Sequence, residues 1–138
     1  MSGMFGEARA VPKHKSVEWY TPAWVFDALG LEFDLDPASP HDHETAVPAA
    51  TKYTVFDDGL KKPWFGRVWM NPPYGPSTGL WVRRMAQHGN GIARCGAGTV
   101  LLAFGDECAN ALRKLGDRGV FIEVPNAKWR PTPTRRQR

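Results

Sequence analysis

The sequence predicts an α/β protein with a mostly parallel sheet in one domain. From residue 66 onward, short apolar segments (66–70, 98–104 and 119–124) alternate with segments of helical periodicity (77–89 and 106–116). Such alternation is typical of strands joined by crossover helices. A chain of 138 residues with 42% hydrophobic residues has the size and composition of one globular domain.

The first helix and the first strand are expected before this alternating region. Thr21 is a suitable helix cap, Pro22 suits the first helical position, and Gly30 suits the residue after the last turn. Residues 31–36 (LEFDLD) alternate apolar and acidic side chains, which is the period of a strand. Pro37 ends that strand.

Two further helices have clear boundary residues. Residues 77–89 read as a helix that Ser77 or Thr78 caps and that Gly89 closes. Residues 106–116 carry a second helical pattern, with alanine and leucine on one side.

The remaining segments are an irregular stretch and two expected strands. Residues 40–62 are polar with few periodic signals, and residues 56–60 (FDDGL) read as a turn. Residues 98–104 (GTVLLAF) form the continuous apolar run that is typical of a buried parallel strand. Residues 119–124 (GVFIEV) are expected to be the last strand.

The chain is expected to comprise a flexible N-terminal arm (1–15), a folded domain (16–126) and a basic tail (127–138). The arm lacks the apolar stretch of a secretory signal, and no apolar run approaches the ~20 residues of a membrane span. The net charge of +4 is compatible with a nucleic-acid partner. The tail is interpreted as a solvated segment, with a phosphate-contacting arm as the alternative. Cys95 and Cys108 form no metal or disulfide pattern, which favours a reduced, cytosolic setting.

The stretch Asn71-Pro72-Pro73-Tyr74 directly follows the expected strand 66–70. Both prolines have a fixed φ and no N–H, so the stretch is a stiff loop. Ligands of open α/β sheets bind beyond the carboxyl ends of strands, and Asn71 lies at such an end. The loop is therefore either a rigid turn or, as we favour, part of a catalytic site.

This loop can activate an exocyclic amine such as N6 of adenine, whose lone pair is conjugated into the ring. The Asn71 side-chain carbonyl and the Pro72 backbone carbonyl can accept hydrogen bonds from the two N–H groups of the amine. Tyr74 offers an aromatic face on which a base can stack, worth roughly 1–3 kcal/mol. Pro73 stiffens the loop, and this preorganises the acceptors.

The sequence resembles the phage-type DNA N-6-adenine methyltransferases, the Dam-like family. The segments EWYTPAWVFDALGLEFDLDPAS and YTVFDDGLKKPWFGRVWMNPPYG carry the resemblance, which is strong over 18–85 and weaker up to residue 124. It implies a Rossmann-like, S-adenosylmethionine-dependent methyltransferase fold for residues 16–126. Because the sequence stops soon after 119–124, we expect this fold to lack its closing strands.

The resemblance also assigns roles by position. The implied site residues are Asn71, Pro72, Pro73 and Tyr74 in the catalytic loop, and Tyr20, Thr21, Pro22, Asp36, Pro37, Ala38 and Asp58 (with Asp57 as its alternative) around the cofactor. The sequence departs from many cofactor loops of this class because no glycine-rich turn follows Asp36.

The resemblance implies a site-specific enzyme that methylates N6 of adenine in double-stranded DNA with S-adenosyl-L-methionine as cofactor. It implies no metal and no membrane association, and a phage or prophage gene whose product works in the bacterial cytoplasm. We interpret residues 41–44 (HDHE) as a solvated loop rather than a metal site. An RNA or protein-glutamine N-methyltransferase and a truncated DNA-binding relic remain alternatives, and the oligomeric state remains open.

Overall fold

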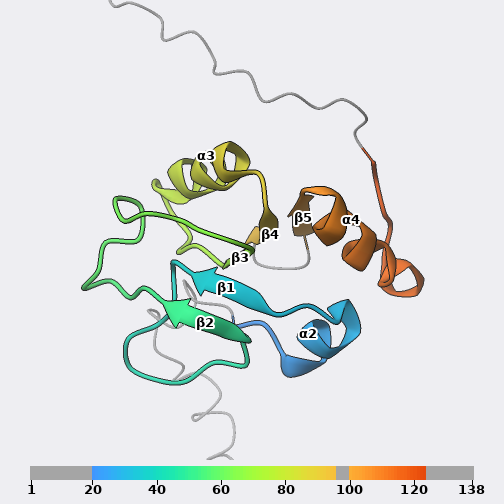
Figure 1. Cartoon of the computed structure of the whole chain (residues 1–138), viewed down its shortest axis with the longest axis horizontal. Coiled ribbons are helices and arrows are strands. Elements are labelled where there is room, and N and C mark those ends of the chain that lie inside the picture. Colours follow the sequence, from blue (N-terminus) through green and yellow to red (C-terminus); the bar gives the residue numbers. More distant parts are fainter. Residues whose placement is uncertain (1–19, 96–99, 124–138) are drawn as a thin grey trace, which may run out of the picture.

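The computed structural model describes residues 20–95 and 100–123, which contain a five-stranded sheet in the order β2-β1-β3-β4-β5 (Figure 1). The strands are β1 (Phe33–Asp36), β2 (Ala49–Lys52), β3 (Val68–Met70), β4 (Gly91–Cys95) and β5 (Val100–Phe104). The helices are α2 (Ala23–Leu29), α3 (Thr78–His88) and α4 (Asp106–Arg113), followed by the short 3₁₀-helix η2 (Gly116–Arg118). β2, β1, β3 and β4 are parallel, and β5 is antiparallel to β4. The expected mostly parallel α/β sheet is thus confirmed.

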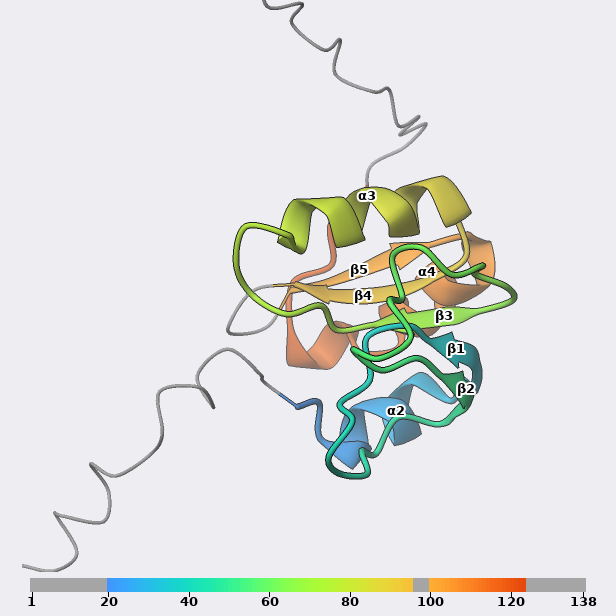
Figure 2. The ribbon, with the colours of Figure 1, turned by 90° about the vertical axis from the view of Figure 1, so that its left-hand side faces the viewer.

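Helices cover both faces of the sheet, with α3 above it and α2 below it in Figure 2. On the α2 face, Phe26, Phe33 and Trp69 form edge-to-face aromatic pairs, and Ala111 of α4 belongs to the same buried cluster. A second buried cluster on the α3 face includes Met85. The central strands are therefore buried on both sides, as parallel sheets require.

The ends of α2 agree only in part with the sequence prediction. Gly30 ends the helix with φ 65°, and its N–H bonds to the Phe26 carbonyl (3.0 Å). The predicted Thr21 cap is wrong, because Pro22 occupies the N-cap position and no side chain caps the helix. The Thr21 hydroxyl bonds to Arg94 instead (2.9 Å).

The end of α3 follows the prediction more closely than its beginning. Gly89 closes the helix with φ 74° and an N–H bond to the Met85 carbonyl (2.9 Å). Ser77 stands at the N-cap but makes no capping side-chain bond.

Two strands lie where the sequence indicated none. β2 falls inside the stretch 40–62 and pairs with β1, with Phe33 opposite Ala49. β4 follows α3 and pairs in parallel with β3, with Val68 opposite Gly91.

The predicted parallel direction of the apolar run 98–104 is wrong for its described residues. They form β5, in which Val100 lies opposite Cys95 and Phe104 opposite Gly91. β4 already occupies the place beside β3, so the next strand adds to the free edge of β4 in the reverse direction. The order from residue 66 is therefore strand, helix, strand, strand, helix.

The predicted last strand at 119–124 is wrong for the residues that the structure describes, since 119–123 pair with no strand there. Val120 and Ile122 are 91% and 78% exposed. Arg113 holds this segment against α4, because its guanidinium lies over the Phe121 ring and pairs with Glu123 (2.8 Å). The predicted arm (1–15) and tail (127–138) lie outside the described residues.

Within the described ranges, no helix has the length and apolar character needed to cross a membrane.

Candidate active site

The carboxyl ends of β1 and β3 lie side by side, because the two strands are parallel neighbours with Leu35 opposite Val68. Beyond them a cavity of about 420 Å³ opens. Nine of the eleven residues that the sequence assigned to the site line this cavity. They are Tyr20, Thr21, Asp36, Pro37, Ala38, Asp58, Asn71, Pro72 and Pro73. The fold therefore brings together segments that lie up to 53 residues apart (Tyr20 to Pro73).

Asp36 is a buried carboxyl group in the wall of this cavity and is only 3% exposed. The Ala38 N–H donates a hydrogen bond to Asp36 Oδ1 (3.2 Å), which turns the chain sharply at Pro37. Burial raises the pKa of Asp36 to about 6, while the Ala38 N–H, the charge of Lys52 and a bond to Ser39 oppose that rise. The carboxyl group thus changes its charge close to neutral pH.

Thr21 lines the cavity and is held in place by Arg94. It is 8% exposed, and its hydroxyl oxygen accepts a hydrogen bond from Arg94 Nη1 (2.9 Å). Arg94 belongs to β4, so this bond fixes the segment before α2 to that strand. Pro22, by contrast, is exposed and does not line the cavity.

The loop after β3 is braced from the start of α3. Thr78 Oγ1 donates a hydrogen bond to the Pro73 carbonyl (2.9 Å) and accepts one from the Gly75 N–H (3.1 Å). Pro72 is buried, whereas Asn71 is half-buried, and both residues line the cavity. The loop that the prolines stiffen is therefore also tied down at its far end.

Tyr74 does not line the cavity in this structure. The residue is half-buried, and its hydroxyl oxygen is buried without a hydrogen-bond partner among the described residues. A stacking role for Tyr74 stays a prediction. This role requires that the Tyr74 ring face a base that binds beside the loop.

The turn at 56–60 separates the two aspartates that the sequence left as alternatives. Asp57 faces its own turn, where it accepts bonds from the Thr54 N–H (2.8 Å) and from Lys62 Nζ (3.1 Å). Asp58 lines the cavity and has a positive φ of 57°. By position, Asp58 is therefore the better candidate.

Gly59 permits a close approach between this turn and the loop after β1. A Cβ atom at Gly59 would lie 2.0 Å from the Pro37 carbonyl oxygen. The Gly59 carbonyl also accepts a hydrogen bond from Trp64 Nε1 (2.7 Å), which anchors the turn to the core on the α3 face. Only glycine fits here, and it keeps the cavity walls together.

The family model for DNA N-6-adenine-methyltransferase (Dam) matches residues 9–93 of the chain. The chain belongs to this family. No curated protein and no solved structure matches it. Among the residues that the structure describes, those that line the cavity, from Tyr20 to Trp81, all lie within the match. The mostly parallel sheet is compatible with a Rossmann-like methyltransferase fold without the closing strands.

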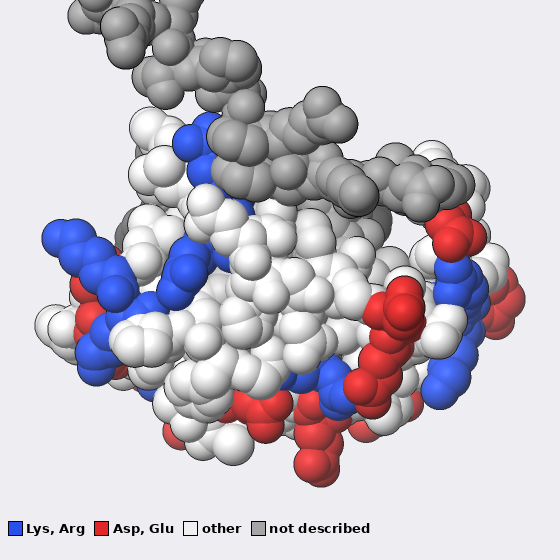
Figure 3. Space-filling model, turned by 45° about the horizontal axis from the view of Figure 1, so that its top comes forward, with Lys and Arg blue, Asp and Glu red and all other residues white. Residues whose placement is uncertain are grey.

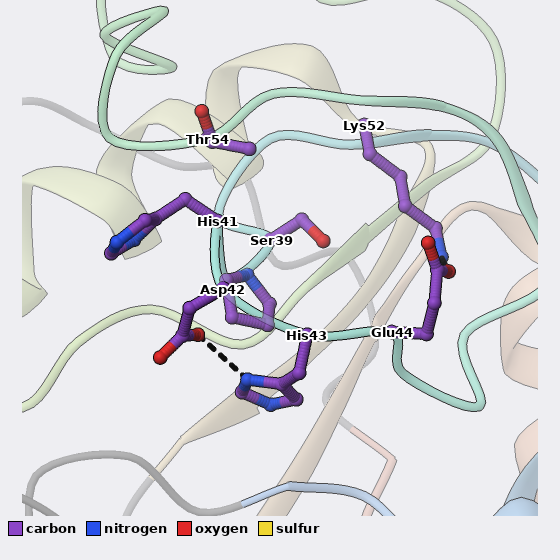
Figure 4. Close-up of a pocket in the computed structure, with 8 residues that line it drawn as sticks. Ser39, His41, Asp42, His43, Glu44, Lys52 and Thr54 are labelled. Carbon is purple, nitrogen blue, oxygen red and sulfur yellow. Dashed lines mark hydrogen bonds and ion pairs between the residues drawn. The ribbon is translucent and has the colours of Figure 1, made fainter.

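A second cavity of about 410 Å³ adjoins the first in this Dam-family chain and shares residues with it, including Ser39, His41 and Thr54. Figure 4 shows Asp42 paired with His43 (2.7 Å) and Lys52 pointing toward Glu44 (3.7 Å). The bond to His43 lowers the pKa of Asp42. In the described part of the chain, no three His, Cys, Asp or Glu side chains converge as a metal site would require.

Several residues of this candidate site were not identified from the sequence. Trp69 and Trp81 line the cavity, but their positions inside a strand and on the inner face of a helix mark them only as core residues. Arg94 lies in β4, a strand that the sequence pattern did not indicate. No sequence signal connects it with Thr21, which lies 73 residues earlier.

Proposed function

We propose that this Dam-family chain transfers a methyl group from S-adenosyl-L-methionine to N6 of adenine at specific sites in double-stranded DNA. The observation that carries the proposal is that one cavity joins the segments 20–21, 36–38 and 71–73. The first two segments are the implied cofactor contacts, and the third is the implied catalytic loop.

The cavity has the character that such a cofactor requires. Its volume of about 420 Å³ lies within the range of small-molecule sites, roughly 300–1,000 Å³. Its wall combines apolar side chains such as Val47 and Trp81 with the carboxyl groups of Asp36 and Asp58. Because S-adenosylmethionine carries a sulfonium and an ammonium group, carboxylates in the wall complement its charge.

The catalytic contribution of the chain itself is to position the acceptor amine. The Asn71 side-chain oxygen and the Pro72 carbonyl oxygen accept hydrogen bonds from the two N–H groups of N6. These bonds favour a tetrahedral nitrogen with a free lone pair. Bound S-adenosylmethionine supplies an electrophilic methyl group. Thr78 and the two prolines hold the acceptors in place, so the loop needs little reorganisation.

The target adenine leaves the duplex to reach this loop, as in other enzymes that modify bases. The sequence resemblance further supports a phage or prophage origin, with action on DNA inside a bacterial host.

Two measurements test the proposal in order. Calorimetric titration with S-adenosylmethionine should show saturable binding, and the same titration of Asn71→Ala should give an affinity within a few-fold. Transfer of labelled methyl groups should then occur to duplex DNA, with N6-methyladenine as the product, and not with Asn71→Ala. Absence of cofactor binding would favour a DNA-binding relic, whereas transfer to RNA or to protein glutamine alone would identify a different acceptor.

A further inference from the structure

Val55 and Phe56 form an exposed apolar pair at the rim of the cavity. Their side chains are 72% and 82% exposed, and no aromatic side chain in the described part of the chain is more exposed than Phe56. Single exposed apolar residues are common on protein surfaces. Here, however, the pair stands beside a candidate active site, and Val55 lines the cavity together with Asn71.

The turn that presents Phe56 is held by several hydrogen bonds. The Asp57 N–H bonds to the Thr54 carbonyl (2.9 Å), and Asp57 Oδ2 accepts a bond from the Thr54 N–H (2.8 Å). The Phe56 N–H bonds to Thr54 Oγ1 (3.3 Å), and Lys62 pairs with Asp57 (3.1 Å). The outward position of the ring therefore follows from the geometry of the turn.

Phe56 lies outside the cavity wall but contacts His41, a residue that lines the cavity. Phe56 does not line the cavity, and its ring meets the edge of the His41 ring, with centroids 5.2 Å apart and planes at 81°. A ring that covered a bound cofactor would form part of the cavity wall. Phe56 is instead placed to contact a molecule that lies over the mouth.

The charges in this turn do not favour a purely electrostatic contact with a molecule that lies over the mouth of the cavity. Asp57 and Asp58 are paired with Lys62 and Lys61 (3.1 and 3.4 Å), so the turn is close to neutral. On the face drawn in Figure 3, basic and acidic side chains lie close together at the left and along the right edge, with uncharged surface between them. The feature that the rim offers in this turn is an apolar ring.

We propose that Phe56 is a wedge that enters the base stack of duplex DNA when the target adenine leaves it. This inference rests on the proposed function. Proteins that kink DNA or extrude bases often insert apolar side chains between base steps, and this offsets part of the unstacking cost. The ring would occupy the gap beside the extruded adenine, while Asn71 and Pro72 hold that adenine inside the cavity.

The test compares Phe56→Ala with Ile122→Ala, a matched control that is 78% exposed and does not line the cavity. Each protein is assayed on a duplex and on the same duplex with an abasic site opposite the target adenine, which is easier to extrude. We expect Phe56→Ala to lose about tenfold or more in kcat/KM on the intact duplex and less than about threefold on the abasic one. Affinity for S-adenosylmethionine should be unchanged, Phe56→Trp should retain activity, and the control should resemble the wild type.

Two outcomes would overturn the wedge. Equal losses on both duplexes with weaker cofactor binding would place the ring over the cofactor, and unchanged activity would remove Phe56 from the reaction. If the wild type methylates neither duplex, the proposed function fails, and the wedge is judged from 2-aminopurine fluorescence at the target position. The wild type and Ile122→Ala should then brighten the probe and Phe56→Ala should not, while equal or absent brightening would refute the wedge.

Discussion

Replacement of Asp36 by asparagine should stabilise the protein above pH 6 and leave its stability near pH 4 unchanged. Burial raises the pKa of Asp36 from 3.8 to about 6 in the folded state. Between these two values the folded chain binds more protons than the unfolded chain, so the free energy of unfolding falls as pH rises. Raising the pKa from 3.8 to about 6 lowers the free energy of unfolding by about 3 kcal/mol once the carboxyl group is ionised, and the full loss of stability is reached above pH 6.

The asparagine side chain of the Asp36→Asn variant stays neutral at every pH and keeps an oxygen that can accept the Ala38 N–H. Urea unfolding between pH 4 and pH 8, followed by fluorescence of the buried tryptophans, gives the stability of each variant. Asp27→Asn serves as the control, because Asp27 is an exposed carboxylate on α2. A stability difference between wild type and Asp36→Asn that is the same at pH 4 and pH 7 would refute this reasoning.

The same group links cofactor binding to pH. A cationic ligand in the cavity favours the ionised carboxylate of Asp36, so it lowers the pKa of this group. Affinity for S-adenosylmethionine should therefore increase as pH rises through about 6, and Asp36→Asn should lose most of that dependence. Calorimetric titrations at several pH values measure both effects, and a parallel dependence in the two proteins would exclude Asp36 as its source.

Substitutions at three further positions, Asn71, Tyr74 and Gly59, examine the loops around the cavity. Asn71→Ala should abolish methyl transfer and Asn71→Asp should retain part of it, because a carboxylate also accepts a bond from an amine; normal transfer by the alanine variant would contradict the mechanism. Tyr74→Phe should be mild, since the buried hydroxyl has no partner among the described residues, whereas Tyr74→Ala should sharply reduce kcat/KM on duplex DNA. Gly59→Ala should destabilise the fold by about 1–3 kcal/mol and weaken cofactor binding, because the new methyl group meets the Pro37 carbonyl. Gly79→Ala, at an open helical position, should instead stabilise by about 0.5–1 kcal/mol in the same urea assay, and similar effects of the two substitutions would show that the close approach at Gly59 is not maintained.

The sequence predicted the elements around the site well where local signals were strong. α2 ends at Gly30 and α3 at Gly89 because each glycine adopts the left-handed conformation that ends a helix. β1 ends at Asp36 because Pro37 cannot continue the ladder. These signals depend on one residue and its neighbours, so they can be recognised without knowledge of the fold.

The elements that were missed or misassigned depend on pairing across the sheet. β2 is a four-residue edge strand whose residues are half-buried or exposed, so it shows no clear alternation. β4 (GIARC) contains glycine and arginine and gives little strand signal, although its place beside β3 decides the direction of β5. A continuous apolar run fits a parallel or an antiparallel strand equally, and residues 119–123 have strand-forming side chains but no partner strand in the described structure.

The described residues after the family match support the candidate site through core packing. The match ends within β4, at residue 93, and the described residues that line the cavity all precede that point. Cys108 and Ala111 of α4 pack in the same buried cluster as Trp69, and Trp69 lines the cavity. Because protein cores are close-packed and transmit strain, a change of volume in α4 reaches the cavity through this ring. The described residues beyond 93 therefore support the part of the sheet on which the cavity is built, although none of these described residues lines it.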